Sequence, residues 1–346
     1  MLYYYALLYY NINLKQIKTM KKIRLISTLI GLLAFSTLAK ADLKIVTSIK
    51  PIHSLAGYIM DGVGSPGLIV DGYNSPHSFQ LKPSHAIMLE QADIIFWVGE
   101  DLENFLEKPL ATIAKKAEKI ELLEIKDIKK LKFRERNIFE EHEGHDDHGD
   151  DAKKEEHDDH GHDAKKEEHD EHDDHDDHGH GEYDPHIWLD PVNAKIILNE
   201  ITEHLIENDS KNAATYKSNL AKALAEIDKL IIDVITETNT DLSYVVFHDA
   251  YQYYENRFNV NILGAMTVNP DVMPGAEQIH EIHEVIEHDN VNCILSEPQF
   301  NPDIIKSIAK DTSVKTGVLD PLGANLKPGK DLYFDLIRYM SASFNC

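Results

Sequence analysis

Histidine and acidic residues dominate one stretch of the chain, which runs from Glu140 to Glu182. It reads EEHEGHDDHGDDAKKEEHDDHGHDAKKEEHDEHDDHDDHGHGE. Neutral imidazole is a common protein ligand for zinc and similar ions, so this string of imidazoles and carboxylates is expected to bind such ions with low specificity. Eleven of the chain's 20 histidines lie here: His142, His145, His148, His157, His160, His162, His169, His172, His175, His178 and His180.

This segment is not expected to form a folded core. No large apolar residue lies between Phe139 and Tyr183, so nothing would offset the entropy lost on ordering the chain. The unit DAKKEEHD occurs at 151–158 and again at 163–170, a duplication typical of low-complexity sequence. We predict a disordered loop over 140–182 that gathers metal. A solubilising acidic linker is the alternative, although solubility alone does not call for so many histidines.

Four residues outside this loop have side chains that could form a tighter metal site. Three follow or end apolar runs that are predicted to be strands, and the fourth comes directly after the acidic segment. In open α/β sheets, ligands bind beyond the carboxyl ends of the strands. Three imidazoles and one carboxylate suit four-coordinate zinc, and a cleft between two lobes would gather them. The four are His77, His186, His248 and Asp320.

Two weaker candidates lie near the same strand ends. His53 follows the first predicted strand, where it would line the cleft as a ligand or beside one. Glu297, in the sequence SEPQF, could orient a ligand imidazole or could simply begin a helix.

These residues need a scaffold of strands alternating with helices. Eight apolar runs rich in branched residues predict strands, with helical stretches between them, and this alternation indicates parallel sheets. We predict an α/β fold of two similar lobes, each a mainly parallel sheet of about four strands flanked by helices. The strands are Leu43–Ile49, Gly67–Val70, Ile94–Val98, Ile120–Ile125, Tyr244–Phe247, Val260–Ala265, Asn292–Ser296 and Val314–Leu319.

A long helix is predicted between the two halves, over residues 211–238. Tyr216, Leu220, Ile227 and Val234 belong to one apolar stripe at helical spacing, and no Gly or Pro interrupts it. It would form a rigid connector between an N-terminal lobe at 42–210 and a C-terminal lobe at 239–346. A coiled-coil dimer helix is the alternative, but the heptads are few.

The N-terminal region has the pattern of an export signal. Basic residues at 21–24 precede an apolar run, Leu25–Leu38, and Ala39-Lys40-Ala41 fits a small-x-small cleavage site. We predict that residues 1–41 are a signal region, that translation begins at Met20, and that the signal is cleaved after Ala41. An uncleaved membrane anchor is the alternative. No cysteine lies near the cleavage site, so a periplasmic protein without a lipid anchor is expected.

Charge and cysteine content narrow the function further. The formal net charge is −25, but 21 acidic residues and four lysines in the loop account for −17 of it, which leaves −8 elsewhere. With no basic stripe to displace counterions, nucleic acid binding is not expected. The only two cysteines, Cys293 and Cys346, predict one disulfide that pins the C-terminal tail to an interior strand.

Seven segments occur in an order that resembles a known family: PIHSLAGYIMDGV, SPHSFQLKPS, ADIIFWVGEDLENFL, PHIWLDP, VVFHDAYQYYENRF, SEPQF and LDPLG. The chain is similar to the solute-binding proteins of ABC-type zinc and manganese uptake systems, and most similar to the periplasmic zinc members. The resemblance covers 42–346. It implies two α/β lobes joined by a long helix, and one metal ion in the cleft between them.

Carried over by motif, the implied ligands are His77, His186 and His248. Manganese members have Glu at the position of His248, and imidazole there favours zinc. Some zinc members use a Glu directly before the first ligand histidine, but this chain has Pro76, which cannot ligate. Asp320 is therefore the expected fourth ligand, with water as the alternative.

The resemblance implies a periplasmic receptor that binds Zn²⁺ and delivers it to an inner-membrane permease with its cytoplasmic ATPase. The receptor is expected to be a monomer and not an enzyme. A manganese receptor of the same family and a secreted zinc buffer or adhesin are the alternatives. A secreted zinc hydrolase is disfavoured, because the sequence has no H-E-x-x-H and no evident base beside the cluster.

Overall fold

The computed structural model describes residues 42–134, 137–138, 181–268, 270, 272, 274–310, 312 and 314–346. The predicted signal region at 1–41 lies outside the described residues. So does the histidine-rich loop, apart from Gly181 and Glu182 at its end.

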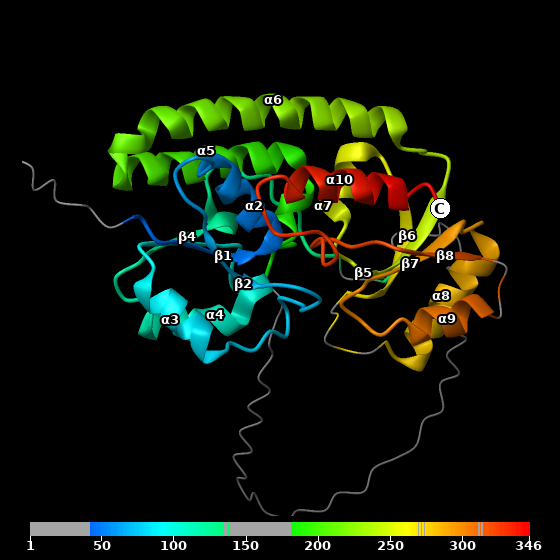
Figure 1. The fold of residues 1–346 in the computed structure, drawn as a ribbon. Coiled ribbons are helices and arrows are strands. Elements are labelled where there is room, and N and C mark those ends of the chain that lie inside the picture. The colour runs from blue at the N-terminus through cyan, green and yellow to red at the C-terminus, as the bar shows by residue number, and fades with distance from the viewer. Residues whose placement is uncertain are drawn as a thin grey trace, which may run out of the picture. The chain divides into compact units, whose positions relative to one another are not determined.

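The first lobe is a four-stranded parallel sheet in the order β2-β1-β3-β4 (Figure 1). Apolar side chains of its two central strands are fully buried, because helices cover both faces. Its strands are β1 (Ile45–Ile49), β2 (Gly67–Val70), β3 (Ile94–Trp97) and β4 (Glu118–Glu121). Its helices are α2 (Lys50–Ile59), α3 (Pro83–Gln91) and α4 (Glu100–Thr112).

The second lobe repeats this arrangement, with four parallel strands in the order β6-β5-β7-β8. Its strands are β5 (Ser243–His248), β6 (Asn261–Thr267), β7 (Cys293–Ser296) and β8 (Lys315–Val318). The helices α7 (Gln252–Phe258), α8 (Ala276–His288) and α9 (Asp303–Lys310) connect them. The predicted α/β fold with two similar sheets is thus confirmed.

The predicted strand at Ile120–Ile125 was placed too late in the chain. The strand is β4, Glu118–Glu121, and a 3₁₀ turn follows at Leu122–Glu124. Leu122 and Leu123 are both buried. Two neighbouring side chains cannot both point into one face of a strand, so the chain coils there to bury them together.

A long helix, α6 (Ala213–Glu237), runs along both lobes (Figure 1). At 25 residues it spans roughly 38 Å. It begins two residues later than predicted, because residues 210–212 form a 3₁₀ turn in which Asp209 accepts hydrogen bonds from the side chains of Asn212 and Tyr216. Its buried stripe packs on α5 (Pro191–Asn208), α2 and the last helix, α10 (Leu332–Ser343).

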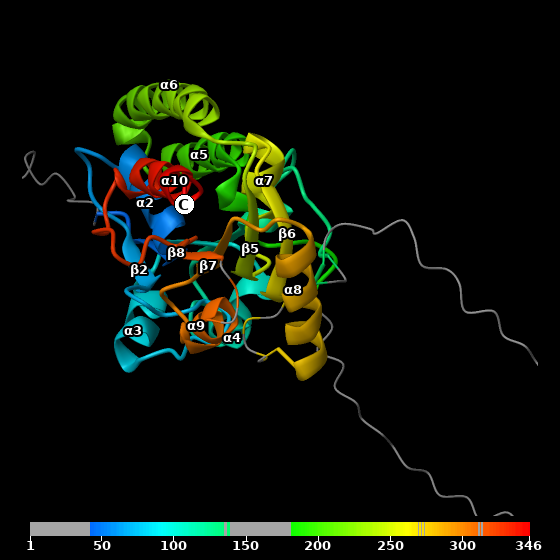
Figure 2. The same cartoon turned by 90° about the vertical axis from the view of Figure 1, so that its right-hand side faces the viewer.

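The two figures show the helices in two groups about the sheets. Helices α2, α5, α6 and α10 lie on one side of the strands, and α3, α4, α8 and α9 lie on the other (Figures 1 and 2). Helix α10 follows the second sheet in sequence yet packs against α2 of the first lobe. The lobe boundaries 42–210, 211–238 and 239–346 stay predictions.

The predicted disulfide joins Cys293, at the start of β7, to the last residue, Cys346. It fixes the tail beside the second sheet, where Phe344 is fully buried. Among the helices of the described residues, none has the length and apolarity needed to cross a membrane.

Candidate metal centre

Three histidines from distant parts of the chain meet where strands of both lobes end. One nitrogen each of His77, His186 and His248 lies within 4.8 Å of the others. Nε2 of His248 is 3.4 Å from Nε2 of His186. Within the described residues, this is the only group of three or more His, Cys, Asp or Glu side chains close enough to hold a metal ion.

Each histidine is held by a local feature of its sequence. His248 is the last residue of β5, and both it and His186 are buried. His186 precedes a 3₁₀ turn, Ile187–Leu189, whose three apolar side chains are fully buried and anchor it. The Trp188 indole in that turn donates a hydrogen bond to the Pro321 carbonyl of the second lobe. His77 lies in the β2–α3 loop, where its amide donates to Ser75 Oγ.

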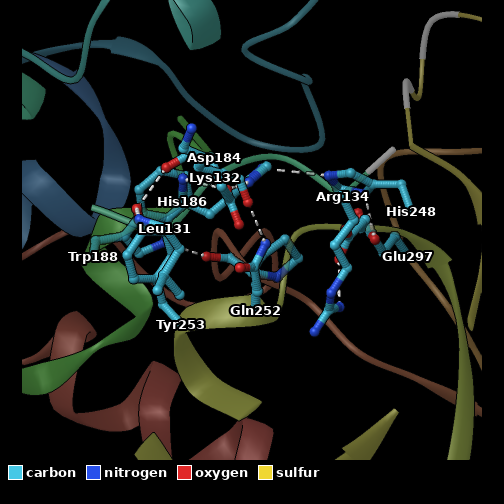
Figure 3. A network of polar contacts seen from close by, with 12 residues as sticks. Leu131, Lys132, Arg134, Asp184, His186, Trp188, His248, Gln252, Tyr253 and Glu297 are labelled. Atoms are coloured by element: carbon cyan, nitrogen blue, oxygen red, sulfur yellow. Dashed lines mark hydrogen bonds and ion pairs between the residues drawn. The ribbon is translucent and has the colours of Figure 1, made fainter. Parts of the chain in front are cut away.

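Two buried carboxylates fix the orientation of two of the imidazoles (Figure 3). Nδ1 of His186 donates to Asp184 Oδ1 at 2.7 Å, and Nδ1 of His248 donates to Glu297 Oε1 at 2.6 Å. An ionised carboxylate can only accept, so an imidazole paired with one carries its proton on Nδ1 and presents the lone pair of Nε2. Burial raises the pKa of Asp184 to about 7, so this arrangement holds for His186 above that pH. Carboxylate–histidine pairs of this kind are usual around protein-bound zinc.

The environment of the two buried histidines shifts their pKa values in opposite directions. Burial, assisted by the neighbouring His248, holds the pKa of His186 well below its usual 6.5. Burial also acts to lower the pKa of His248, but Glu297, together with Asp249 and Asp184, outweighs it and the pKa of His248 is raised. Protons are therefore expected to compete with a metal ion at His248 before they compete at His186.

An ion-pair network lies beside these supports (Figure 3). Arg134 pairs with Asp249, the residue after His248, at 3.0 Å, and with Glu255 of α7 at 2.5 Å. Nearby, the backbone of Leu131 accepts a hydrogen bond from the amide of Asp184. The chain on both sides of the histidine-rich segment is thus tied to residues that neighbour the ligands.

The cavity between the imidazoles is small. Its volume is about 10 Å³, enough for one ion or one water molecule. The walls include Trp188, Phe300 and Leu322, so the lining around the imidazoles is mainly apolar. A second cavity of about 460 Å³ adjoins it, and the two share Ser75, Gln299 and Phe300 as lining residues.

The structure does not bring Asp320 into this group. Oδ1 of Asp320 accepts hydrogen bonds from Gln299 Nε2 at 2.9 Å and from the amides of Leu322 and Gly323. Oδ2 accepts from the amide of Ala324 at 2.5 Å. The carboxylate holds the turn that follows β8, and its role as the fourth ligand stays a prediction.

Of the two weaker candidates, Glu297 contacts one of the three histidines and His53 is placed outside the group. Nε2 of His53 lies 3.2 Å from the Pro66 carbonyl, outside the group of three, whereas Glu297 contacts a ligand directly. Sequence reasoning missed Asp184, which also accepts a hydrogen bond from the amide of His186. The D-P-H spacing was the available signal, since an Asp commonly turns the chain toward the amide two residues on.

Replacing Glu297 with Gln should weaken zinc binding about tenfold, at the low end of the range for partners of metal-bound imidazoles. The amide keeps the shape of the side chain but is a weaker acceptor for the His248 Nδ1 proton. Competition with a chelator would measure the change. Glu103→Gln is a matched control, because Glu103 is equally buried and accepts hydrogen bonds from the amides of Val98 and Gly99. An equal loss in both variants would contradict a role for Glu297 at the metal.

Comparison with known proteins gives a consistent result. The profile of the family described as zinc-uptake complex component A, periplasmic (ZnuA), matches residues 45–345. The high-affinity zinc uptake system protein ZnuA of Brucella abortus is 46% identical over 313 residues, which cover 89% of this chain and 92% of that protein. The protein of the same name from Yersinia pestis is 35% identical over 311 residues, covering 88% and 91%.

Solved structures share the fold. A crystal structure of ZnuA superposes with a TM-score of 0.65 at 20% identity, covering 88% of this chain and all of that one. At that identity the similarity concerns the arrangement of helices and strands.

Proposed function

We infer the function from the premise that this chain belongs to the family of periplasmic zinc-binding components of ABC-type zinc uptake systems. That family consists of solute-binding transport proteins and not of enzymes. We propose that this chain holds one Zn²⁺ between His77, His186 and His248, and that it delivers the ion to a membrane permease driven by an ATPase.

The observation that supports this proposal most strongly is the convergence of the three imidazoles with two of their Nε2 atoms already directed inward. Buried carboxylates set the protonation of His186 and His248, so the ligands need little reorganisation to accept an ion. Nitrogen ligands suit zinc, whereas manganese prefers oxygen ligands. The donor set therefore favours zinc over the manganese alternative.

Two separate binders would follow from this proposal. The cleft would hold one ion tightly, and the histidine-rich loop would hold several ions weakly because its ligands need not share one geometry. If the chain were a zinc buffer or an adhesin in which the loop is the main binder, the cleft would contribute little.

Deletion of residues 140–180 separates these possibilities. The deletion retains Gly181 and Glu182, whose backbones bond Asp101 and Phe133 and hold the chain before His186. Zinc titration of the full chain and the shortened chain, against a competing chelator, should give one tight site in both. Absence of a tight site in the shortened chain would overturn the proposal.

Zinc affinity should fall as the pH decreases from 7.5 to 5. Imidazoles must be neutral to ligate, and the raised pKa of His248 means that this residue is protonated first. At pH values above that pKa the zinc affinity should no longer change with pH, because the imidazoles are already neutral and no proton has to leave them. Titration of the shortened chain at several pH values would show this, and affinity unchanged at pH 5 would contradict an imidazole site.

We also propose that the mature chain begins at Asp42, carries no lipid anchor and acts as a monomer in the periplasm. The pattern around Ala41 and the lack of a nearby cysteine support the first two points. Mass spectrometry of the secreted protein would test the start at Asp42 and the absence of a lipid, and light scattering would test the monomeric state.

A further inference from the structure

Three imidazoles leave one position open on a tetrahedral zinc ion, if the cleft binds zinc as proposed above. Gln299 is placed to act there. It lines the small cavity between the histidines, and its Oε1 is buried without a hydrogen-bond partner among the described residues. Buried carbonyl oxygens are rarely left without a hydrogen-bond donor. A donor that arrives with the ion would supply the hydrogen bond that Gln299 Oε1 lacks.

Asp320 fixes which way the amide of Gln299 faces. Nε2 of Gln299 donates to Asp320 Oδ1, and a carboxylate cannot donate in return. Asp320 itself cannot turn freely, because the amides of Leu322, Gly323 and Ala324 hold both of its oxygens. The nitrogen of the Gln299 amide must therefore face Asp320, and Oε1 must face away from it.

We propose that Gln299 Oε1 accepts a hydrogen bond from a water molecule bound at the fourth position of the zinc ion. Zinc makes its bound water a stronger proton donor than bulk water, which suits a neutral carbonyl acceptor. Asp320 then acts on the metal through Gln299, as a positioning residue, and is not a ligand.

The location of Gln299 gives this water a use. Gln299 lines both the metal cavity and the adjoining 460 Å³ cavity. A water ligand on that side is the most easily exchanged ligand, so a ligand from outside could replace it without breaking a zinc–histidine bond. The ion would enter and leave by the same side.

The test compares Gln299→Met with Gln80→Met in the full chain. Methionine keeps the length of glutamine but removes the carbonyl, and Gln80 lines only the outer cavity. Zinc affinity from chelator competition should fall about tenfold for Gln299→Met, as for other partners of metal ligands, and stay unchanged for Gln80→Met. Thermal unfolding of the metal-free proteins would verify that each variant folds. If Gln299→Met does not fold, Gln299→Leu is measured in its place.

Cobalt(II) substitution supplies a second readout. Its visible spectrum reports the ligands of the ion, so Gln299→Met and Asp320→Asn should shift the spectrum in the same way if both act on one bound water. A large loss of affinity in Asp320→Asn with no change in Gln299→Met would show that Asp320 ligates directly and would overturn the inference. Absence of tight binding in the unaltered chain would instead overturn the proposed function, and the inference with it.

Discussion

Replacing His248 with Ala should remove the tight zinc site. Loss of a partner to a metal-bound imidazole weakens binding about 10–100-fold, so loss of the imidazole itself should exceed that range. Two nitrogens would remain, and Glu297 would lose the imidazole that donates to it. Isothermal titration and chelator competition on the chain lacking 140–180 would measure the change without interference from the loop.

Thermal unfolding gives an independent measure of the same variant. An ion that binds only the folded state raises the unfolding temperature, and the increase grows with affinity. Zinc should raise the unfolding temperature of the unaltered chain strongly, and it should raise that of the His248→Ala variant only slightly. The metal-free forms must be compared too, because a cavity at His248 also lowers stability.

Two histidine controls make the result specific to the site. His280 is exposed on α8 and pairs with Glu284, so His280→Ala should leave affinity unchanged. His53→Ala tests a half-buried imidazole that contacts the Pro66 carbonyl and lies outside the group of three. If His53→Ala lost the tight site and His248→Ala kept it, the assignment of ligands would be wrong.

Replacing Cys346 with Ser should lower the free energy of unfolding strongly and leave the zinc affinity unchanged. The disulfide to Cys293 spans 53 residues. The chain-entropy treatment gives roughly 4 kcal/mol for a loop of this length. Urea unfolding under non-oxidising and oxidising conditions would measure it, and reduction of the unaltered chain should reproduce the loss.

The position of the disulfide explains why binding should survive. Cys293 begins β7, whereas Glu297, which supports His248, follows the opposite end of that strand. The tail has further contacts of its own, including a hydrogen bond from the Tyr244 hydroxyl to the Phe344 carbonyl. A variant that loses less than about 1 kcal/mol would indicate that these contacts hold the tail without the disulfide.

Much of the fold could be predicted because its pattern is local. A buried parallel strand needs a short run of apolar residues, and β2, Gly67–Val70, coincides with its predicted bounds. The error at β4 arose where an edge strand of polar residues precedes two buried leucines, so the apolar run marks the turn and not the strand. Helix α6 was recognisable from its uninterrupted apolar stripe.

The candidate ligands could also be named from sequence, because strand ends in α/β sheets are where ligands bind. His248 ends β5, and His77 follows β2. The roles of Asp184, Gln299 and Asp320 could not be read in the same way. Whether a carboxylate ligates, orients an imidazole or caps a turn depends on which of its lone pairs are already taken by neighbouring donors.

The sequence by itself determined the alternation of strands and helices, the connecting helix, the paired cysteines and the candidate histidines at or after strand ends, because each of these depends on the residue types in a short stretch of chain. Only the tertiary structure decided which atoms meet. It turned the Asp320 carboxylate toward the amides of its own turn and Gln299, and it set Asp184 and Glu297 against two imidazoles. Hydrogen bonds need a donor and an acceptor within about 3 Å and in line, and that condition is fulfilled by packing between distant segments, which no local pattern encodes.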